Sequence, residues 1–303
     1  MNIYEQIEHN AINNDYINNT AITQILPSNT IKTISYKDLF ELSEKVSQLL
    51  LNIGIKQKEK IYISSKDSIN FVSAFLGALK VGIVPIPGNP ELSEKQILYI
   101  LHDSTPKVIL NDALQNKKKI KFVCSIYTNK NWQKLLSEIK YKKIKTKISK
   151  NDQVAFLIYS SGTTGHPKAI IHQHEVIKNT YFLHKEILKL QTQDKIYTTS
   201  RLFFAYALGN NFFAPLLIGL NTIFNDNLLD NPNLTYIIKK FNPIAIFSVP
   251  TVYRRLLQDS NTDLKLLSNI KYFISAGERI PKKLYVEWKN KVHSPLLNCY
   301  GTT

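Results

Sequence analysis

The sequence has little cysteine, methionine or tryptophan, and its apolar runs are short. Its 303 residues contain two cysteines, one methionine and two tryptophans. Cys124 and Cys299 lie far apart and form no Cys-x-x-Cys motif, so neither a disulfide framework nor a zinc site is expected. An apolar run over 71–79 stops at Lys80 and is too short to span a membrane. The start of the chain lacks the basic-then-apolar order of a secretory signal, so a cytoplasmic protein is expected.

Acidic residues are also scarce, and the formal net charge is +16. Between 116 and 150, Glu138 is the only acidic residue among many lysines. Such a stretch can attract nucleic acid, an anionic membrane or a phosphorylated ligand, or it can be an ordinary solvated surface. Because no nucleic-acid-binding motif accompanies the lysines, the solvated surface is favoured and no specific nucleic-acid partner is expected.

Alternating helix and strand patterns indicate an α/β fold. Hydrophobic residues make up 44% of the chain, which is enough for a sizeable core. Apolar spacing and turn residues predict helices over 36–51 and 69–80, and strands over 60–64, 83–87 and 107–110. Strands that alternate with helices favour mostly parallel sheets covered on both faces. Residues 1–30 give only weak signals and are predicted to form a weakly structured N-terminal segment.

The most informative stretch runs from Ser160 to Lys168, after an apolar strand pattern at 154–158. Gly162 and Gly165 permit close backbone approach, and successive N–H groups in such a loop form an anion-binding concavity. Further donors come from the side chains of Ser160, Ser161, Thr163, Thr164 and Lys168. The spacing is not that of the P-loop, because the glycines are three apart and Ala169 follows the lysine. The interpretation is a phosphate-binding loop of another kind, with a plain turn as the alternative.

Downstream, His172 and His174 lie two apart in an apolar run, a spacing that could bind a metal ion on one strand face. No third ligand is near in the sequence, so a hydrogen-bonded structural pair is favoured and no metal site is predicted. Aromatic and small residues are interleaved over 202–210, which suits either a flat slot for an apolar ligand or an ordinary core. Apolar runs at 244–248 and 270–274 are predicted to be buried strands.

The run at 160–168 resembles the signature of the adenylate-forming enzymes, the superfamily of acyl-CoA synthetases, luciferases and peptide-synthetase adenylation domains. The string Phe-Phe-Ala-Tyr-Ala-Leu-Gly-Asn at 203–210 is similar to the acyl-pocket motif of benzoate-CoA and other aryl-CoA ligases. The final Tyr-Gly-Thr-Thr resembles the family motif Tyr-Gly-x-Thr-Glu. The resemblance implies two mostly parallel sheet lobes flanked by helices, with 31–303 as an incomplete AMP-binding N-terminal domain of an adenylate-forming enzyme.

The resemblance also implies a reaction. A carboxylic acid, aromatic and benzoate-like, would be activated by ATP as acyl-AMP and then joined to coenzyme A as a thioester, with Mg²⁺ accompanying the ATP. The implied ATP-binding residues are Ser160, Ser161, Gly162, Thr163, Thr164, Gly165, Lys168, Ala276, Gly277, Glu278, Tyr300, Gly301, Thr302 and Thr303. The implied substrate-binding residues are Phe204, Ala205, Tyr206, Gly209 and Ser275.

In the same resemblance, the Mg²⁺-binding Glu and the C-terminal domain with its catalytic Lys fall beyond Thr303. No catalytic residue is therefore expected within this chain, which alone would be inactive or weakly active unless a separate chain supplied that domain. Two other hypotheses stay open. One is a truncated, non-catalytic protein that binds a nucleotide or an acyl group, and the other is a basic protein associated with nucleic acid.

Overall fold

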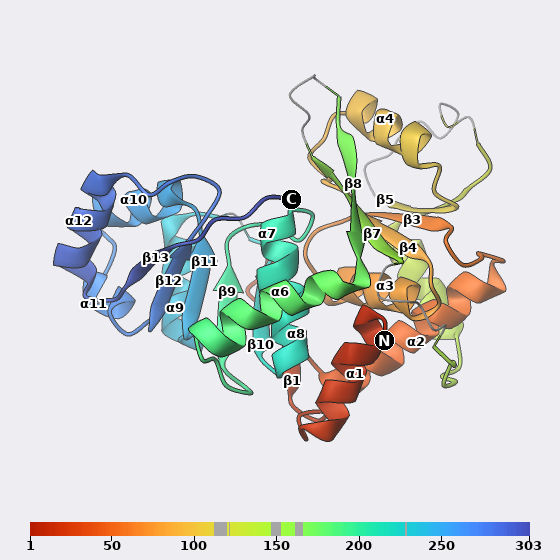
Figure 1. Ribbon diagram of the computed structural model, residues 1–303, viewed down its shortest axis with the longest axis horizontal. Helices are drawn as coiled ribbons and strands as arrows, with labels where there is room; N and C mark the ends of the chain where they lie inside the picture. Colours follow the sequence, from red (N-terminus) through yellow and green to blue (C-terminus); the bar gives the residue numbers. More distant parts are fainter. Residues whose placement is uncertain (112–119, 121, 147–152, 161–165, 228) are drawn as a thin grey trace. The chain divides into compact units, whose positions relative to one another are not determined.

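The computed structural model describes residues 1–303 except 112–119, 121, 147–152, 161–165 and 228. The chain forms two compact units (Figure 1). Unit 1 contains Met1–Asn18, Ser35–Lys178 and Thr303, and unit 2 contains Asn19–Ile34 and Asn179–Thr302. Each unit is built around a mostly parallel sheet with helices, so the α/β fold predicted from the sequence is confirmed.

Unit 1 has a four-stranded sheet in the order β4-β3-β5-β6, with parallel pairs throughout. Its strands are β3 (Lys60–Ser64), β4 (Val84–Pro87), β5 (Val108–Asn111) and β6 (Ser125–Tyr127). Its longer helices include α2 (Tyr36–Asn52), α3 (Ile69–Lys80), α4 (Glu94–Ser104) and α5 (Asn129–Glu138). Both α2 and α3 begin where expected because the hydroxyl groups of Ser35 and Ser68 cap the first backbone N–H groups.

Helices α2 and α3 pack closely at Gly77. A Cβ atom at this position would lie 2.6 Å from the backbone oxygen of Ser43 and 2.6 Å from Val46 Cγ1. The hydroxyl of Ser47 also donates a hydrogen bond to the carbonyl oxygen of Gly77 at 2.8 Å. The absence of a side chain at Gly77 therefore sets the distance between the two helices.

We expect Gly77→Val to lower the free energy of unfolding by about 1–3 kcal/mol or more, because the backbone of α2 cannot move away without disrupting its packing. Urea titration followed by circular dichroism measures the change. Gly301→Val is the matched control, since a Cβ there meets nothing within 4 Å. Equal stabilities of the two variants would contradict the close approach.

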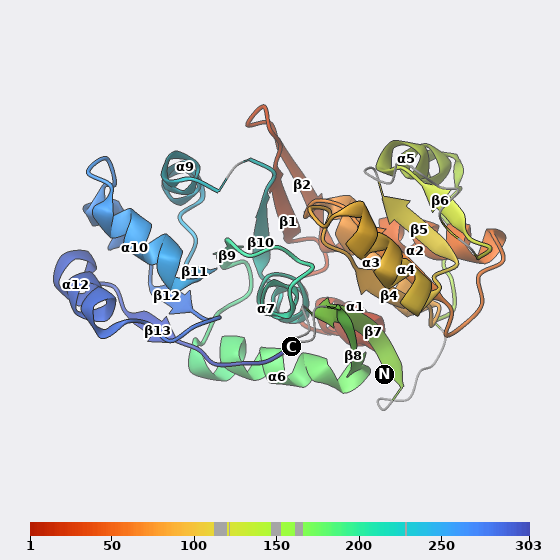
Figure 2. The same ribbon diagram turned by 90° about the horizontal axis from the view of Figure 1, so that it is seen from above.

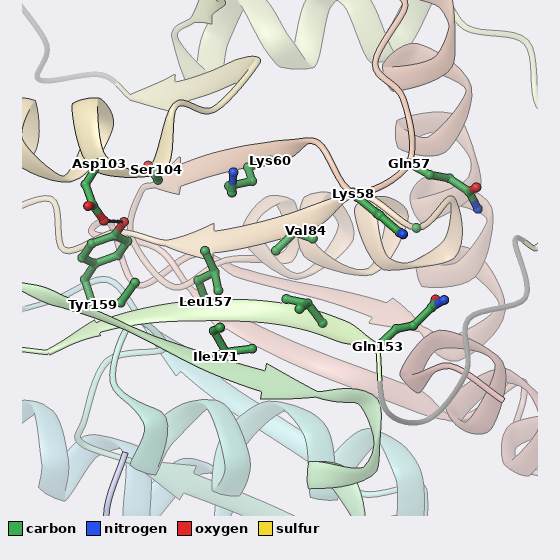
Figure 3. A pocket seen from close by; sticks show the side chains of 13 residues that line it. Gln57, Lys58, Lys60, Val84, Asp103, Ser104, Gln153, Leu157, Tyr159 and Ile171 are labelled. Atoms are coloured by element: carbon green, nitrogen blue, oxygen red, sulfur yellow. Dashed lines mark hydrogen bonds between the residues drawn. The ribbon is translucent and has the colours of Figure 1, made fainter.

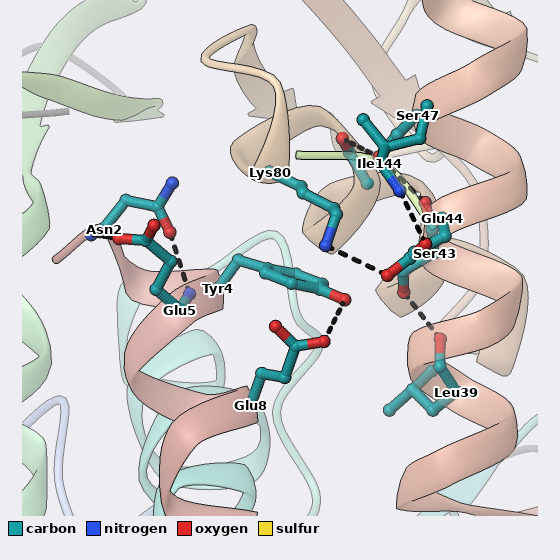
Figure 4. Close-up of polar contacts among 11 residues, drawn as sticks. Asn2, Tyr4, Glu5, Glu8, Leu39, Ser43, Glu44, Ser47, Lys80 and Ile144 are labelled. Carbon is teal, nitrogen blue, oxygen red and sulfur yellow. Dashed lines mark hydrogen bonds and ion pairs between the residues drawn. The ribbon is translucent and has the colours of Figure 1, made fainter. Parts of the chain in front are cut away.

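A buried ion pair links α2 and α3 close to the N-terminal helix (Figure 4). Lys80 Nζ lies 3.1 Å from Glu44 Oε1, and the two side chains are 1% and 2% exposed. The same ammonium group lies 4.2 Å from the ring centroid of Tyr4. The second carboxylate oxygen of Glu44 accepts the backbone N–H of Ile144 at 2.9 Å. Both charges are thus paired inside the protein.

The first 30 residues differ from the weakly structured segment expected from the sequence. They contain α1 (Ile3–Asn13), which begins with a capping box between Asn2 and Glu5, and β1 (Thr20–Ile25). Tertiary packing explains the difference: Ile3, Tyr4 and Ile7 are fully buried, and β1 pairs with a strand some 200 residues later. Neither contact leaves a strong local pattern in an Asn-rich segment.

Unit 2 has a seven-stranded sheet in the order β13-β12-β11-β9-β10-β1-β2. Besides β1, its strands are β2 (Ile31–Ser35), β9 (Lys195–Thr198), β10 (Asn221–Asn225), β11 (Ala245–Ser248), β12 (Tyr272–Ser275) and β13 (Leu296–Asn298). The five pairs from β13 to β1 are parallel. The predicted strands over 244–248 and 270–274 correspond to β11 and β12.

Helices cover both faces of the unit 2 sheet. They are α6 (Ile177–Phe182), α7 (Ala205–Leu208), α8 (Ala214–Ile218), α9 (Asn231–Phe241), α10 (Pro250–Gln258), α11 (Leu264–Leu267) and α12 (Lys282–Val292), with π-helical segments at Leu183–Ile187 and Gly209–Phe213. Ile246 and Phe273 join a core with α9, α10 and α12. The alternate residues Phe247 and Ile274 join a second core with residues 181–190. Figure 2 shows α10 and α6 on opposite sides of these strands.

Within the part of the chain that the structure describes, no helix combines the length and the apolar character needed to cross a membrane.

Candidate functional site

In unit 1, the predicted phosphate loop lies at the turn of an antiparallel hairpin. Its strands are β7 (Val154–Ser160) and β8 (Lys168–Gln173), and Ser160 pairs with Lys168 in the last register position before the turn. Lys168 is exposed and Ser160 is half-buried. The loop therefore leads into a strand rather than a helix, which separates it from the P-loop, where a helix N-terminus follows the glycines.

The middle of the loop is not part of the described chain. Ser161, Gly162, Thr163, Thr164 and Gly165, all predicted to bind ATP, lie outside the described residues. Just after them, the ring of His166 stacks on that of Tyr99 from α4, with centroids 4.8 Å apart. The described geometry thus fixes the two ends of the loop.

The two histidines after the loop have separate structural surroundings. His172 stacks on Phe156 at 4.6 Å between ring centroids. His174 lies beyond the strand, in a short 3₁₀ turn (His174–Val176), and its Nδ1 accepts the backbone N–H of Ile3 at 3.3 Å. Burial, together with the nearby N-terminal ammonium group, lowers the pKa of His174 to about 4. Among the described residues no group of three or more His, Cys, Asp or Glu side chains could hold a metal ion.

In unit 2, most of the predicted acid- and adenine-binding residues follow the carboxyl ends of adjacent parallel strands. Ser275 ends β12 and pairs in register with Ser248 at the end of β11 and with Asn298 at the end of β13. Ala276 donates its N–H to the carbonyl oxygen of Ser248 at 3.1 Å. Ligands of open parallel sheets bind at this edge, so the structure brings these predicted residues together in a suitable place.

Tyr206 connects the aromatic stretch to the same strands. Its hydroxyl donates to the carbonyl oxygen of Ile274 at 3.2 Å, and its ring lies edge-on to Phe247, with centroids 6.4 Å apart. Burial raises the pKa of the Tyr206 hydroxyl, so this group stays a neutral donor. In contrast, Phe204 precedes α7 and its side chain is 54% exposed. Tyr206 is fixed by its contacts while Phe204 is accessible to a ligand.

The remaining predicted residues fall into two groups. Gly277 has a φ of +88°, which favours glycine at this turn, and Glu278 beside it is exposed. After β13, Tyr300 is 93% exposed, and Gly301, Thr302 and Thr303 are also exposed. Within the described part of the chain, none of these side chains forms a hydrogen bond or an ion pair, so they are accessible to a nucleotide.

Gly209 has a packing role that the sequence did not reveal. It is buried, and a Cβ atom there would lie 2.7 Å from Thr180 Cγ2. Gly209 therefore allows two helical segments of unit 2 to approach each other closely. Its predicted part in binding the acid stays a prediction.

Two buried hydroxyl groups near the predicted Ser275, those of Thr199 and Ser248, were not predicted from the sequence. Thr199 Oγ1 and Ser248 Oγ lie 2.6 Å apart. Ser275 Oγ is fully buried and has no hydrogen-bond partner within the described residues. The sequence does show a serine at the end of each of two apolar strands, Ser248 and Ser275. Only the parallel register of β11 and β12 shows that these serines are neighbours.

These arrangements can be compared with known proteins. The model of the family described as AMP-binding enzyme matches residues 8–303. The chain belongs to the AMP-binding enzyme family.

Relatives of this AMP-binding chain are similar at low sequence identity. One is the 3-hydroxybenzoate–CoA/4-hydroxybenzoate–CoA ligase of Thauera aromatica, 25% identical over 90% of this chain and 55% of the relative. Another is the mitochondrial acyl-coenzyme A synthetase ACSM3 of Rattus norvegicus, 28% identical over 89% of this chain and 49% of the relative. The chain spans about half the length of the curated relatives it matches.

A solved structure supports the fold of the AMP-binding chain. The N-terminal domain of FACL13 from Mycobacterium tuberculosis superimposes with a TM-score of 0.88 at 21% identity, covering 99% of this chain and 76% of that one. The sequence prediction of an N-terminal domain fold of the adenylate-forming type is therefore confirmed.

Proposed function

We propose that this chain takes part in the ATP-dependent activation of a carboxylic acid as acyl-AMP, with coenzyme A as the acyl acceptor. The family match over 8–303 carries the proposal. In the first step a carboxylate oxygen would bond to the α-phosphorus of ATP while the bond to pyrophosphate breaks. In the second, the thiol of coenzyme A would take the acyl group and release AMP.

The residues of the hairpin turn would hold the phosphates of ATP. Lys168 and Ser160 lie side by side at the base of the turn, where an ammonium group and a hydroxyl can donate to the same anion. The first step needs positioning and neutralisation of charge rather than a protein nucleophile. Ser161, Gly162, Thr163, Thr164 and Gly165 would complete the phosphate site.

Magnesium would enter with the nucleotide. Mg²⁺ keeps several water ligands and is usually bound by phosphate oxygens with one or two carboxylates. When bound, the ion would neutralise charge on the phosphates.

In unit 2, the carboxyl edge of the sheet would seat the acid and the adenosine. Tyr206, anchored to Ile274, and the accessible Phe204 and Ala205 would flank the acid, as would Ser275 and Gly209. Ala276, Gly277, Glu278 and Tyr300–Thr303 would contact the nucleotide. Aromatic walls favour a planar, benzoate-like acid. The similarity to a hydroxybenzoate–CoA ligase supports this choice, whereas the similarity to an acyl-coenzyme A synthetase leaves room for an aliphatic acid.

Residues 31–303 would form part of an AMP-binding N-terminal domain. A domain with a catalytic Lys, in the same protein or in a separate chain, would complete the reaction. The alternative function is binding of a nucleotide or acyl group without catalysis. Release of pyrophosphate from ATP in the presence of benzoate-type acids supports the ligase. Nucleotide binding without pyrophosphate release, even when a C-terminal domain is supplied as a separate chain, supports the alternative.

We expect Lys168→Ala to weaken ATP binding by about ten- to a hundred-fold, the value of one charge-assisted hydrogen bond. Isothermal titration calorimetry measures the affinity. Lys37→Ala, another exposed lysine of unit 1, is the control and should bind ATP like the wild type. Unchanged affinity of Lys168→Ala would overturn the phosphate site.

The choice of acid is tested at Phe204. Phe204→His should shift the preference between benzoate and aliphatic acids by about ten-fold while ATP affinity stays the same, because the change removes one apolar wall of the slot. Competition between the acids in the pyrophosphate assay, or in binding if turnover is absent, measures the preference. An unchanged preference would remove the aromatic-acid assignment and leave the nucleotide site untouched.

A further inference from the structure

Unit 1 contains a cavity of about 620 Å³ whose lining does not include Ser160 or Lys168 (Figure 3). Its walls come from the turn before β3, the first residues of β3 and β4, the end of α4, and the hairpin β7–β8. The first residues of parallel strands lie at the edge opposite to their carboxyl ends. The volume is within the range of small-molecule sites.

The middle of the cavity is apolar. Val84 of β4 and Leu157 of β7 belong to the core beneath it, and Ile171 of β8 faces it from the hairpin (Figure 3). Ile171 is 63% exposed. An apolar ligand body placed here would remove this surface from water, which is favourable.

Two lysines line the cavity, Lys58 toward the end away from Asp103 and Lys60 beside Val84 (Figure 3). Neither ammonium group has an ion-pair or hydrogen-bond partner among the residues that the structure describes. The backbone of Lys58 is held in position, because its N–H donates to the carbonyl oxygen of Gly82 at 2.8 Å. Two unpaired lysines beside an apolar surface can bind an anion with charge-assisted hydrogen bonds.

The opposite end of the cavity carries a carboxylate, that of Asp103 (Figure 3). The Tyr159 hydroxyl donates to Asp103 Oδ2 at 2.5 Å, and burial with this carboxylate raises the pKa of the tyrosine. Because the Asp103 carboxylate repels negative charge and already accepts the hydrogen bond of the Tyr159 hydroxyl, this end of the cavity disfavours an anionic group. The polarity of the cavity therefore sets the orientation of a ligand.

We propose that this cavity binds a small amphipathic anion, with its apolar body against Val84, Leu157 and Ile171 and its anionic group at Lys58, away from Asp103. None of the cavity-lining residues is one of the predicted nucleotide-binding residues, and the ligand needs no ATP. Carboxylates, sulfonates and phosphate monoesters with a short alkyl or aryl body have this chemistry.

The test is isothermal titration calorimetry of the full chain without nucleotide, using octanesulfonate as the anionic probe and octanol as its neutral counterpart. We expect octanesulfonate to bind with a dissociation constant below about 1 mM, and octanol at least about ten-fold more weakly. Lys58→Ala and Ile171→Glu should each weaken octanesulfonate binding by about ten-fold or more. Both side chains are exposed, so both variants should fold, which circular dichroism checks.

Lys37→Ala is the control and should keep the wild-type affinity for octanesulfonate. Binding that survives both Lys58→Ala and Ile171→Glu places the probe elsewhere, for example at an acid site in unit 2, and overturns the proposal. Absence of binding to the wild type at about 1 mM overturns it too. Because the assay contains no nucleotide, neither result bears on the proposed ligase function.

Discussion

Lys80→Ala should lower the free energy of unfolding by about 3–5 kcal/mol, since it leaves the buried carboxylate of Glu44 without its partner. The pair is 1% and 2% exposed, so water cannot replace the ammonium group. Glu44 also accepts the backbone N–H of Ile144, and a carboxylate fixed by that bond cannot turn outward. Chemical denaturation followed by tryptophan fluorescence measures the loss.

Two comparisons isolate the cause. Lys291→Ala removes a surface pair with Glu287, whose side chains are 45% and 35% exposed, and should cost less than about 1 kcal/mol. The double variant Lys80→Met with Glu44→Gln removes both charges but keeps an acceptor for Ile144, so it should be more stable than Lys80→Ala. A loss at Lys80 no larger than that at Lys291 would show that the buried pair is not a major stabilising contact.

The partner of Lys80 illustrates what the sequence could predict. The pattern over 69–80 predicted α3 with its observed bounds, because helical spacing and the serine cap are local signals. The Lys80–Glu44 pair joins residues from two helices, and no local pattern marks such a contact. The same holds for α1 and β1, where packing against distant elements sets the structure of an Asn-rich segment.

In the candidate site, too, local features were predictable from the sequence and contacts between distant residues were not. The Ser- and Gly-rich run followed by Pro167 predicted a loop after a buried strand, and the structure has β7 ending at Ser160. Its pairing with Lys168 in an antiparallel hairpin was not predicted. In unit 2, Ser248 and Ser275 became neighbours only through the parallel register of β11 and β12. Residue types are visible in the sequence, whereas their proximity depends on strand order.

Stability should fall steeply as the pH drops from about 6.5 to about 4, because two histidines are buried in the neutral form. Burial lowers the pKa of His184 to about 4 despite its contacts with the carbonyl oxygens of Thr180 and Asn210, at 2.9 and 3.3 Å. The pKa of His174 is lowered to about 4 as well. His184 is also stacked on Phe247 with ring centroids 5.1 Å apart, which leaves no room for water around a charged ring.

The direction follows from proton binding. Because the folded pKa is below the unfolded value, the unfolded chain binds more protons between the two, and stability rises with pH in that window. The stability contributed by the two neutral histidines is therefore fully present above about pH 6.5. This contribution decreases as the pH falls and is lost near pH 4. Each histidine should account for a loss on the order of 3 kcal/mol, a figure that other titrating groups will modify.

Denaturant midpoints measured at several pH values between about 4 and 7 test this expectation for the two units. His184→Gln keeps a donor for a carbonyl oxygen but does not titrate, so it should flatten the pH dependence of unit 2 even if it lowers stability at neutral pH. His9→Gln changes an exposed histidine and controls for loss of a histidine elsewhere. If His184→Gln and His9→Gln show the same slope as the wild type, the neutral buried state of His184 is not what makes the fold acid-sensitive.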